Sequence, residues 1–186
     1  IEPGSGFGTG THPTTQLCLK WMEKHLVENT DILDYGCGSG ILSIAAHKLG
    51  AKTVLGIDND YQALRNAERN KSLNSADINL LHTSDYQNQT KFDIVIANIL
   101  LKTIISLKET LLSSLKPKSK LLLTGILKDQ AVELINSFAP EISLNIFDEK
   151  EDWLLFYGKK TILFRSFRKI FIIKLPHIEY FYLIFL

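Results

Sequence analysis

Short apolar runs alternate with segments of helical periodicity from residue 13 to about residue 140 of this chain. The runs are rich in Ile, Val and Leu, which is typical of parallel strands that are buried on both faces. Strands are expected at 32–35, 53–57, 78–82, 92–97 and 120–124. Because strands that alternate with helices build a parallel sheet covered on both sides, the pattern predicts a doubly wound α/β domain.

The segments between the runs have the periodicity of helices, which are expected at 13–26, 41–49, 60–74 and 130–138. The last of these helices is expected to end before Pro140. Between residues 101 and 115, leucines and isoleucines recur at steps of three and four, which predicts one further helix that Pro117 ends. Two last strands, at 142–147 and 153–157, flank an acidic stretch and predict an antiparallel hairpin at the sheet edge.

Composition bounds the class of protein. The 186 residues are enough for one domain with a sizeable core, and 45% hydrophobic with 22% charged residues is ordinary for a globular chain. A formal net charge of +1 gives no strong footprint for binding duplex nucleic acid. Cys18 and Cys37 form neither a disulfide framework nor a metal-binding motif. This cysteine usage fits a reducing cytoplasm, which is the expected location, and with no apolar leader after Ile1 nothing argues for secretion.

The chain changes character after residue 160, so we expect a domain over 1–160 and an atypical apolar and basic extension over 161–186. Basic residues interrupt the extension before any apolar stretch reaches the roughly 20 residues that cross a bilayer, so no membrane span is expected. A basic, aromatic-rich tail can lie on a membrane surface or touch ribosomal RNA. The alternative is an extension that packs against the sheet edge or stays mobile.

A glycine-rich turn follows the strand expected at 32–35. Glycines at 36, 38 and 40 allow a sharp turn and a close approach to a ligand, and the strand at 53–57 leads into Asp58. The dinucleotide fingerprint G-x-G-x-x-G needs a glycine at position 41, which is Ile41. The turn therefore predicts a nucleotide-like cofactor other than a dinucleotide, and a purely structural turn is the alternative.

Two further stretches carry candidate chemistry. Glycines at 6, 8 and 10 precede Thr11, Thr14 and Thr15 at the start of the helix expected at 13–26, where hydroxyls can either donate to a ligand carboxylate or cap the helix. Asn98 ends the apolar strand at 92–97, and ligands of open α/β sheets bind at the carboxyl ends of strands. Its side chain can accept a hydrogen bond from an incoming amine.

Together these stretches resemble the ribosomal protein L11 methyltransferases, the PrmA family. The matching motifs are Gly-Phe-Gly-Thr-Gly-Thr-His-Pro-Thr-Thr at 6–15, Asp-Tyr-Gly-Cys-Gly-Ser-Gly-Ile-Leu at 34–42, Gly-Ile-Asp at 56–58, Ala-Asn-Ile-Leu at 97–100 and Thr-Gly-Ile-Leu at 124–127. The resemblance runs from residue 1 to about residue 160. It implies a class I S-adenosylmethionine-dependent methyltransferase fold, a seven-stranded mostly parallel sheet with a terminal antiparallel hairpin.

The resemblance also implies a function and a set of site residues. S-adenosylmethionine would donate methyl groups to lysine side chains and the terminal amine of ribosomal protein L11. The residues that it implies for cofactor binding are Thr15, Gly36, Asp58 and Asn98, with Phe7, Thr11, His12, Gly38 and Asp85 as neighbours. Asn98 is also the candidate for positioning the amine, and no metal is implied. No residue stands out as a general base, although His12 is the nearest candidate in the sequence.

The sequence leaves other functions open. The family carries a separate N-terminal domain that recognises the ribosomal protein, and that domain is expected to be missing from this chain. One alternative is therefore a truncated or decayed homologue that binds S-adenosylmethionine without turnover, and another is a lysine methyltransferase for a different protein. Enzymes that methylate nucleic acid or glutamine usually have Asn-Pro-Pro-aromatic after the fourth strand, and Ile99-Leu100 departs from that motif. The oligomeric state is not predicted.

Overall fold

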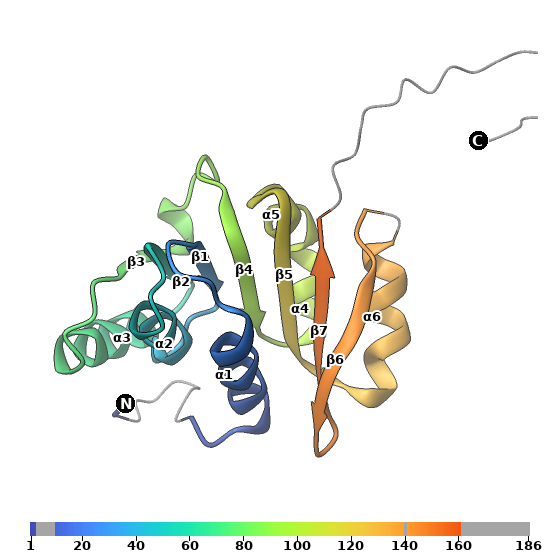
Figure 1. Cartoon of the computed structure of the whole chain (residues 1–186), viewed down its shortest axis with the longest axis horizontal. Coiled ribbons are helices and arrows are strands. Elements are labelled where there is room, and N and C mark those ends of the chain that lie inside the picture. Colours follow the sequence, from blue (N-terminus) through green and yellow to red (C-terminus); the bar gives the residue numbers. More distant parts are fainter. Residues whose placement is uncertain (3–9, 140, 161–186) are drawn as a thin grey trace, which may run out of the picture.

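The computed structural model describes residues 1–2, 10–139 and 141–160, which form one seven-stranded sheet with helices on both faces (Figure 1). The strand order is β3-β2-β1-β4-β5-β7-β6, and β7 alone runs against the direction of the other six strands. The strands are β1 (Asp31–Tyr35), β2 (Thr53–Asp58), β3 (Asn79–His82), β4 (Phe92–Asn98), β5 (Leu115–Leu127), β6 (Leu144–Lys150) and β7 (Trp153–Lys159). The predicted fold class is confirmed, including the antiparallel hairpin.

The helices are α1 (Pro13–His25), α2 (Ile41–Lys48), α3 (Tyr61–Leu73), α4 (Leu101–Ser106), α5 (Lys108–Ser113) and α6 (Ala131–Phe138), with 3-10 turns η1 (Thr83–Asp85) and η2 (Lys128–Gln130). Strand β4 shows how they cover the sheet. Ile94 and Ile96 pack into one buried apolar cluster with α1 and α2, whereas Val95 and Ala97 pack into a second cluster with α4, α5 and α6. Alternate side chains of one apolar strand thus serve two cores.

The helix predicted over residues 101–115 is wrong in two respects. It is divided at Leu107 into α4 and α5, and it ends at Ser113, so that Leu115 already belongs to β5. The Phe92 N–H donates to the Ser114 carbonyl at 2.8 Å, which draws the chain into the sheet before Pro117. Pro117 is tolerated inside β5 because the β4–β5 register shifts there: Phe92 pairs with Leu115, but Ile94 pairs with Lys120.

The first strand of the hairpin is displaced by two to three residues from the predicted 142–147, whereas the second begins at Trp153 as predicted and runs two residues further. Residues 148–150 of the acidic stretch belong to β6, and only Glu151 and Asp152 form the turn, with Glu151 at a φ of 58°. Strand β7 lies between β5 and β6, so β6 is the edge strand. This order brings the first residue of β7, Trp153, to the end of the sheet where the parallel strands finish.

The boundary between a domain over 1–160 and an extension over 161–186 stays a prediction, because the extension lies outside the described residues. None of the helices in the described ranges combines the length and the apolar character needed to cross a membrane.

At the amino ends of the parallel strands, Lys116 of β5 forms ion pairs with residues of β1 and β4. Its Nζ lies 2.6 Å from Asp31 Oδ2 and 2.8 Å from Asp93 Oδ2. The hydrogen bond from Lys116 lowers the pKa of Asp31 and raises that of the lysine. The three groups therefore hold the amino ends of β1, β4 and β5 together.

We expect Lys116→Met to lower the free energy of unfolding by about 0.5–1 kcal/mol at pH 7, because the pair is partly exposed and screened by solvent. Since Asp31 has a lowered pKa, its contribution is present above the ordinary carboxyl pKa and is lost as pH falls through the lowered value. Urea unfolding at pH 7 and pH 3 measures the difference, with Lys102→Met on the exposed side of α4 as the control. A difference that is as large at pH 3 as at pH 7 would contradict the ion pair.

Candidate functional site

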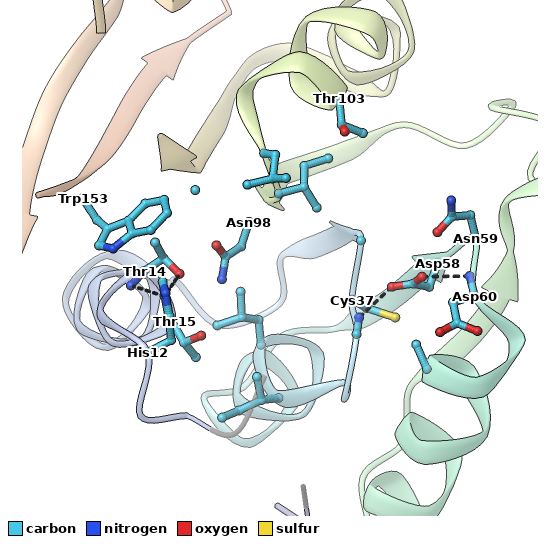
Figure 2. Close-up of a pocket in the computed structure, with 18 residues that line it drawn as sticks. His12, Thr14, Thr15, Cys37, Asp58, Asn59, Asp60, Asn98, Thr103 and Trp153 are labelled. Atoms are coloured by element: carbon cyan, nitrogen blue, oxygen red, sulfur yellow. Dashed lines mark hydrogen bonds between the residues drawn. The ribbon is translucent and has the colours of Figure 1, made fainter. Parts of the chain in front are cut away.

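A pocket of about 500 Å³ lies at the carboxyl ends of the parallel strands (Figure 2). It is next to the neighbouring strands β1 and β4, between which the strand order of the sheet reverses. This is the position at which open α/β sheets bind ligands, and the volume lies within the roughly 300–1,000 Å³ of small-molecule sites. The lining residues are His12, Thr14, Thr15, Gly36, Cys37, Gly38, Ile41, Leu42, Asp58, Asn59, Asp60, Ala63, Asn98, Ile99, Leu100, Thr103, Gly125 and Trp153.

The glycine-rich turn forms the floor between β1 and α2. Gly36, Gly38 and Gly40 have φ values of 82°, 54° and 80°, a region that side chains with a Cβ disfavour. The N–H groups of Gly36 and Cys37 both donate to the Ile57 carbonyl, at 2.7 and 2.9 Å. A Cβ on Gly36 would collide with the Ile99 side chain. The turn is therefore closely fitted between β2 and the residues that follow β4.

Asp58 fixes one end of the pocket. It is 9% exposed at the end of β2; Oδ2 accepts from the Gly38 N–H at 2.8 Å, and Oδ1 accepts from the Asp60 N–H at 3.0 Å. Asp60 in turn caps α3 by accepting from the Gln62 N–H at 2.7 Å. One carboxylate thus joins the glycine turn to the β2–α3 connection. A carboxylate has about four lone-pair sites, so capacity for a ligand remains after these two bonds.

The start of α1 forms the other end. His12 is the N-cap, and its Nδ1 accepts from the Thr14 N–H at 3.3 Å and lies 2.8 Å from Thr14 Oγ1. Pro13 occupies the first helical turn, as expected. Thr15 is fully buried, and its Oγ1 has no hydrogen-bond partner among the described residues. A buried hydroxyl without a partner is costly, so this atom marks a place where a polar ligand group fits.

Asn98 ends β4, and Figure 2 shows its side chain between the His12–Thr15 group and the side of the pocket that holds Asp58. The lining of this one pocket thus includes six of the predicted residues: Thr15, Gly36, Asp58, Asn98, His12 and Gly38.

Two predicted neighbours, Thr11 and Asp85, are not among the lining residues. Thr11 is not a lining residue, and its carbonyl accepts from Gln16 Nε2 at 2.9 Å. Asp85 is exposed in η1, outside the lining, where Ser84 Oγ lies 3.1 Å from its Oδ1. Phe7 lies outside the described residues. The binding roles of all these residues stay predictions.

Sequence reasoning missed Trp153 and Gly125, which also line the pocket. Trp153 begins β7, and its indole packs edge-on against the His12 ring with centroids 5.1 Å apart. An antiparallel strand begins at the edge where parallel strands end, so the first residue of β7 approaches the ligand edge once β7 pairs with β5. Gly125 has a φ of 89°, and a Cβ there would strike the Ile99 carbonyl.

Asp34 lies beneath the glycine turn at 1% exposure. Burial raises its pKa to about 6, although the Ser43 hydroxyl donates to Oδ2 at 2.6 Å and opposes the shift. Its Oδ1 has no partner in the part of the chain that the structure describes. The ionised form of this carboxyl is therefore unfavourable in the folded protein.

A raised carboxyl pKa gives a stability contribution that is complete below the ordinary value near 4 and is lost as pH rises through about 6. We therefore expect Asp34→Asn to be more stable relative to the unmodified chain at pH 7.5 than at pH 4.5. Urea unfolding at both pH values checks this, with exposed Asp77→Asn as the control. The same relative stability at both pH values would contradict the raised pKa.

Among the described residues, no group of three or more His, Cys, Asp or Glu side chains is arranged to hold a metal ion. Burial, the largest cause, raises the pKa of both Cys18 and Cys37, so neither thiol is activated as a nucleophile.

Comparisons with known proteins agree on one family. The profile of the family described as "Ribosomal protein L11 methyltransferase (PrmA)" matches residues 1–161. Ribosomal protein L11 methyltransferases from Shewanella baltica and Dechloromonas aromatica are 42% and 43% identical over 164 and 160 residues, in each case 86% of this chain. The chain spans about half the length of these relatives, 55% and 54%.

A solved structure gives the same result. The crystal structure of a ribosomal protein L11 methylase from Lactobacillus delbrueckii subsp. bulgaricus superimposes with a TM-score of 0.76 and 34% identity, covering 82% of this chain and 81% of that chain. The family profile covers the sheet, the glycine turn and the pocket together. The chain therefore belongs to the ribosomal protein L11 methyltransferase (PrmA) family.

Proposed function

We propose that this protein binds S-adenosylmethionine in the pocket and transfers methyl groups to amino groups of ribosomal protein L11, on lysine side chains and at the chain terminus. The observation that carries the proposal is the pairing of Asp58 with the Gly38 N–H at one end of a pocket whose other end holds Thr15 and Asn98. We also propose the cytoplasm as its location, since both free cysteines are reduced and buried.

The residues of the pocket fit S-adenosylmethionine. Asp58 keeps acceptor capacity for the two ribose hydroxyls beyond its bonds to Gly38 and Asp60. The glycine turn lets the backbone approach the ligand without side chains in the way. At the far end, the Thr15 hydroxyl, which has no hydrogen-bond partner among the described residues, suits the carboxylate or ammonium group of the amino-acid portion.

When bound, S-adenosylmethionine supplies an electrophilic methyl group on a sulfonium ion. The chain contributes position rather than covalent chemistry: Asn98 Oδ1 would accept an N–H of the incoming amine and orient its lone pair. His12 Nδ1 accepts from the Thr14 N–H, so this nitrogen serves in capping α1. Lysine must lose its proton before it reacts, and a largely apolar pocket favours the neutral amine by desolvation.

The test uses the chain with labelled S-adenosylmethionine and purified ribosomal protein L11, and follows added mass on the protein by mass spectrometry. We expect transfer by the unmodified chain and a loss of about 100-fold for Asn98→Ala, because the amine loses its positioning contact. Exposed Asn145→Ala on β6 is the control and should keep full activity.

The outcomes of this experiment distinguish the proposed function from its alternatives. Calorimetric binding of S-adenosylmethionine without transfer to L11 would overturn L11 as the substrate and favour either a binder without turnover or a methyltransferase for another protein. Transfer to a different ribosomal protein under the same conditions would select the last of these. No binding at all would overturn the cofactor.

A further inference from the structure

Trp153 stands at the end of the pocket that lacks acidic side chains. The lining carboxylates, Asp58 and Asp60, belong to β2 and the turn after it, whereas Trp153 lies beside Thr14 on the Asn98 side (Figure 2). The indole contacts the His12 ring edge-on with centroids 5.1 Å apart, and the backbone of Trp153 is fixed by its pairing with Leu127 of β5. It is a partly exposed tryptophan on a fixed strand end.

We propose that Trp153 is a specificity-determining residue that recognises alkylammonium groups at the acceptor end of the pocket. This inference rests on the proposed methyl transfer to amines and adds the residue that selects them. Leu100, 68% exposed and also lining the pocket, supplies an apolar surface for the methylene stem of the acceptor. The indole supplies the only large aromatic face among the lining residues that the structure describes, and tryptophan gives the strongest cation–π attraction.

The charge balance of the reaction explains why an aromatic face suits this place. The amine lone pair forms the new N–C bond while the S–C bond breaks with its electron pair going to sulfur. The positive charge thereby moves from sulfur to nitrogen, and the product ammonium then releases a proton to water. An indole stabilises that developing cation, and it attracts the unreactive protonated lysine less strongly than the salt bridge of a carboxylate would.

The same face accepts an amine that already carries methyl groups. Methylation removes N–H donors and leaves a bulky cation, which a carbonyl acceptor such as Asn98 Oδ1 binds less well with each step. Cation–π attraction does not need N–H groups. Trp153 would therefore allow a second and third transfer to one nitrogen.

The test separates this inference from the cofactor proposal. Calorimetry first establishes binding of S-adenosylhomocysteine, which lacks the transferable methyl group. The chain saturated with this compound is then titrated with choline, and with 3,3-dimethyl-1-butanol as the uncharged isostere, by ligand-observed NMR. We expect choline to bind about 3- to 10-fold more tightly than the alcohol.

Tryptophan fluorescence locates the binding. The chain has two tryptophans, and Trp21 is 1% exposed on the buried face of α1, so an emission change on adding choline reports Trp153. We expect Trp153→Phe to keep part of the preference for choline and to lose the emission change. Trp153→Leu should lose the preference while S-adenosylhomocysteine binds within about 2-fold of the unmodified chain.

The matched control is Phe147→Leu, the same loss of an aromatic ring at a 38% exposed position of β6 outside the pocket. It should keep the preference for choline. Equal affinities for choline and the alcohol in the unmodified chain, or a preference that survives in Trp153→Leu, would overturn the role of Trp153 while leaving the cofactor site intact. Failure to bind S-adenosylhomocysteine would instead overturn the proposed function.

Discussion

Replacing Gly36 with alanine is expected to reduce the affinity for S-adenosylmethionine by at least about 10-fold. Gly36 has a φ of 82°, where an L-residue costs about 1–2 kcal/mol, and the new Cβ would strike the Ile99 side chain. Relief of that collision must displace either the glycine turn or the residues after Asn98, and both line the pocket. Isothermal calorimetry measures the affinity directly.

Gly50→Ala is a matched control for the backbone cost. Gly50 has a φ of 94°, and a Cβ there would meet the flexible Glu28 side chain at 3.1 Å, far from the pocket lining. We expect this variant to lose about 2–6 °C of melting temperature with unchanged cofactor affinity. Equal affinities for Gly36→Ala and the unmodified chain would show that the glycine turn does not carry the ligand.

Asp58→Asn is expected to weaken binding of S-adenosylmethionine by about 10- to 100-fold, the range for losing hydrogen bonds to a charged acceptor. Both oxygens of Asp58 accept backbone N–H groups, from Gly38 at 2.8 Å and Asp60 at 3.0 Å. The amide of asparagine turns a donor toward one of those N–H groups and toward the ribose. The hydrogen bond from the glycine turn to residue 58 and the contact of residue 58 with the ribose are therefore lost together.

Asp77→Asn, at an exposed position between α3 and β3, controls for the change of charge. It should bind the cofactor as the unmodified chain does. If Asp58→Asn binds normally while remaining folded by circular dichroism, Asp58 is not the ribose acceptor and the adenosine end must lie elsewhere in the pocket.

The five parallel strands could be predicted from the sequence because burial on both faces of the sheet restricts their residues to apolar types. A strand such as β4, whose side chains serve two cores, must be apolar at almost every interior position, and 92–97 is such a run. The glycine turn and Asp58 could be predicted for a related reason, since a turn out of a buried strand requires glycine and few other patterns place an acid at the end of the next strand.

The course of residues 101–119 could not be predicted, because its leucine spacing fits one long helix as well as two short ones. The choice is made by sheet pairing, in which Phe92 binds the Ser114 carbonyl, and such long-range contacts leave no local signal. Trp153 escaped detection for a similar reason. Its place in the pocket depends on β7 entering the sheet between β5 and β6, an order that the hairpin pattern alone does not determine.

The most direct measurement is a crystal structure of the chain with S-adenosylhomocysteine. We predict that the ribose hydroxyls lie within hydrogen-bond distance of Asp58, that the amino-acid portion reaches Thr15 Oγ1, and that the sulfur faces Asn98 and Trp153. A ligand bound outside this pocket, or bound in it with the ribose away from Asp58, would contradict the site.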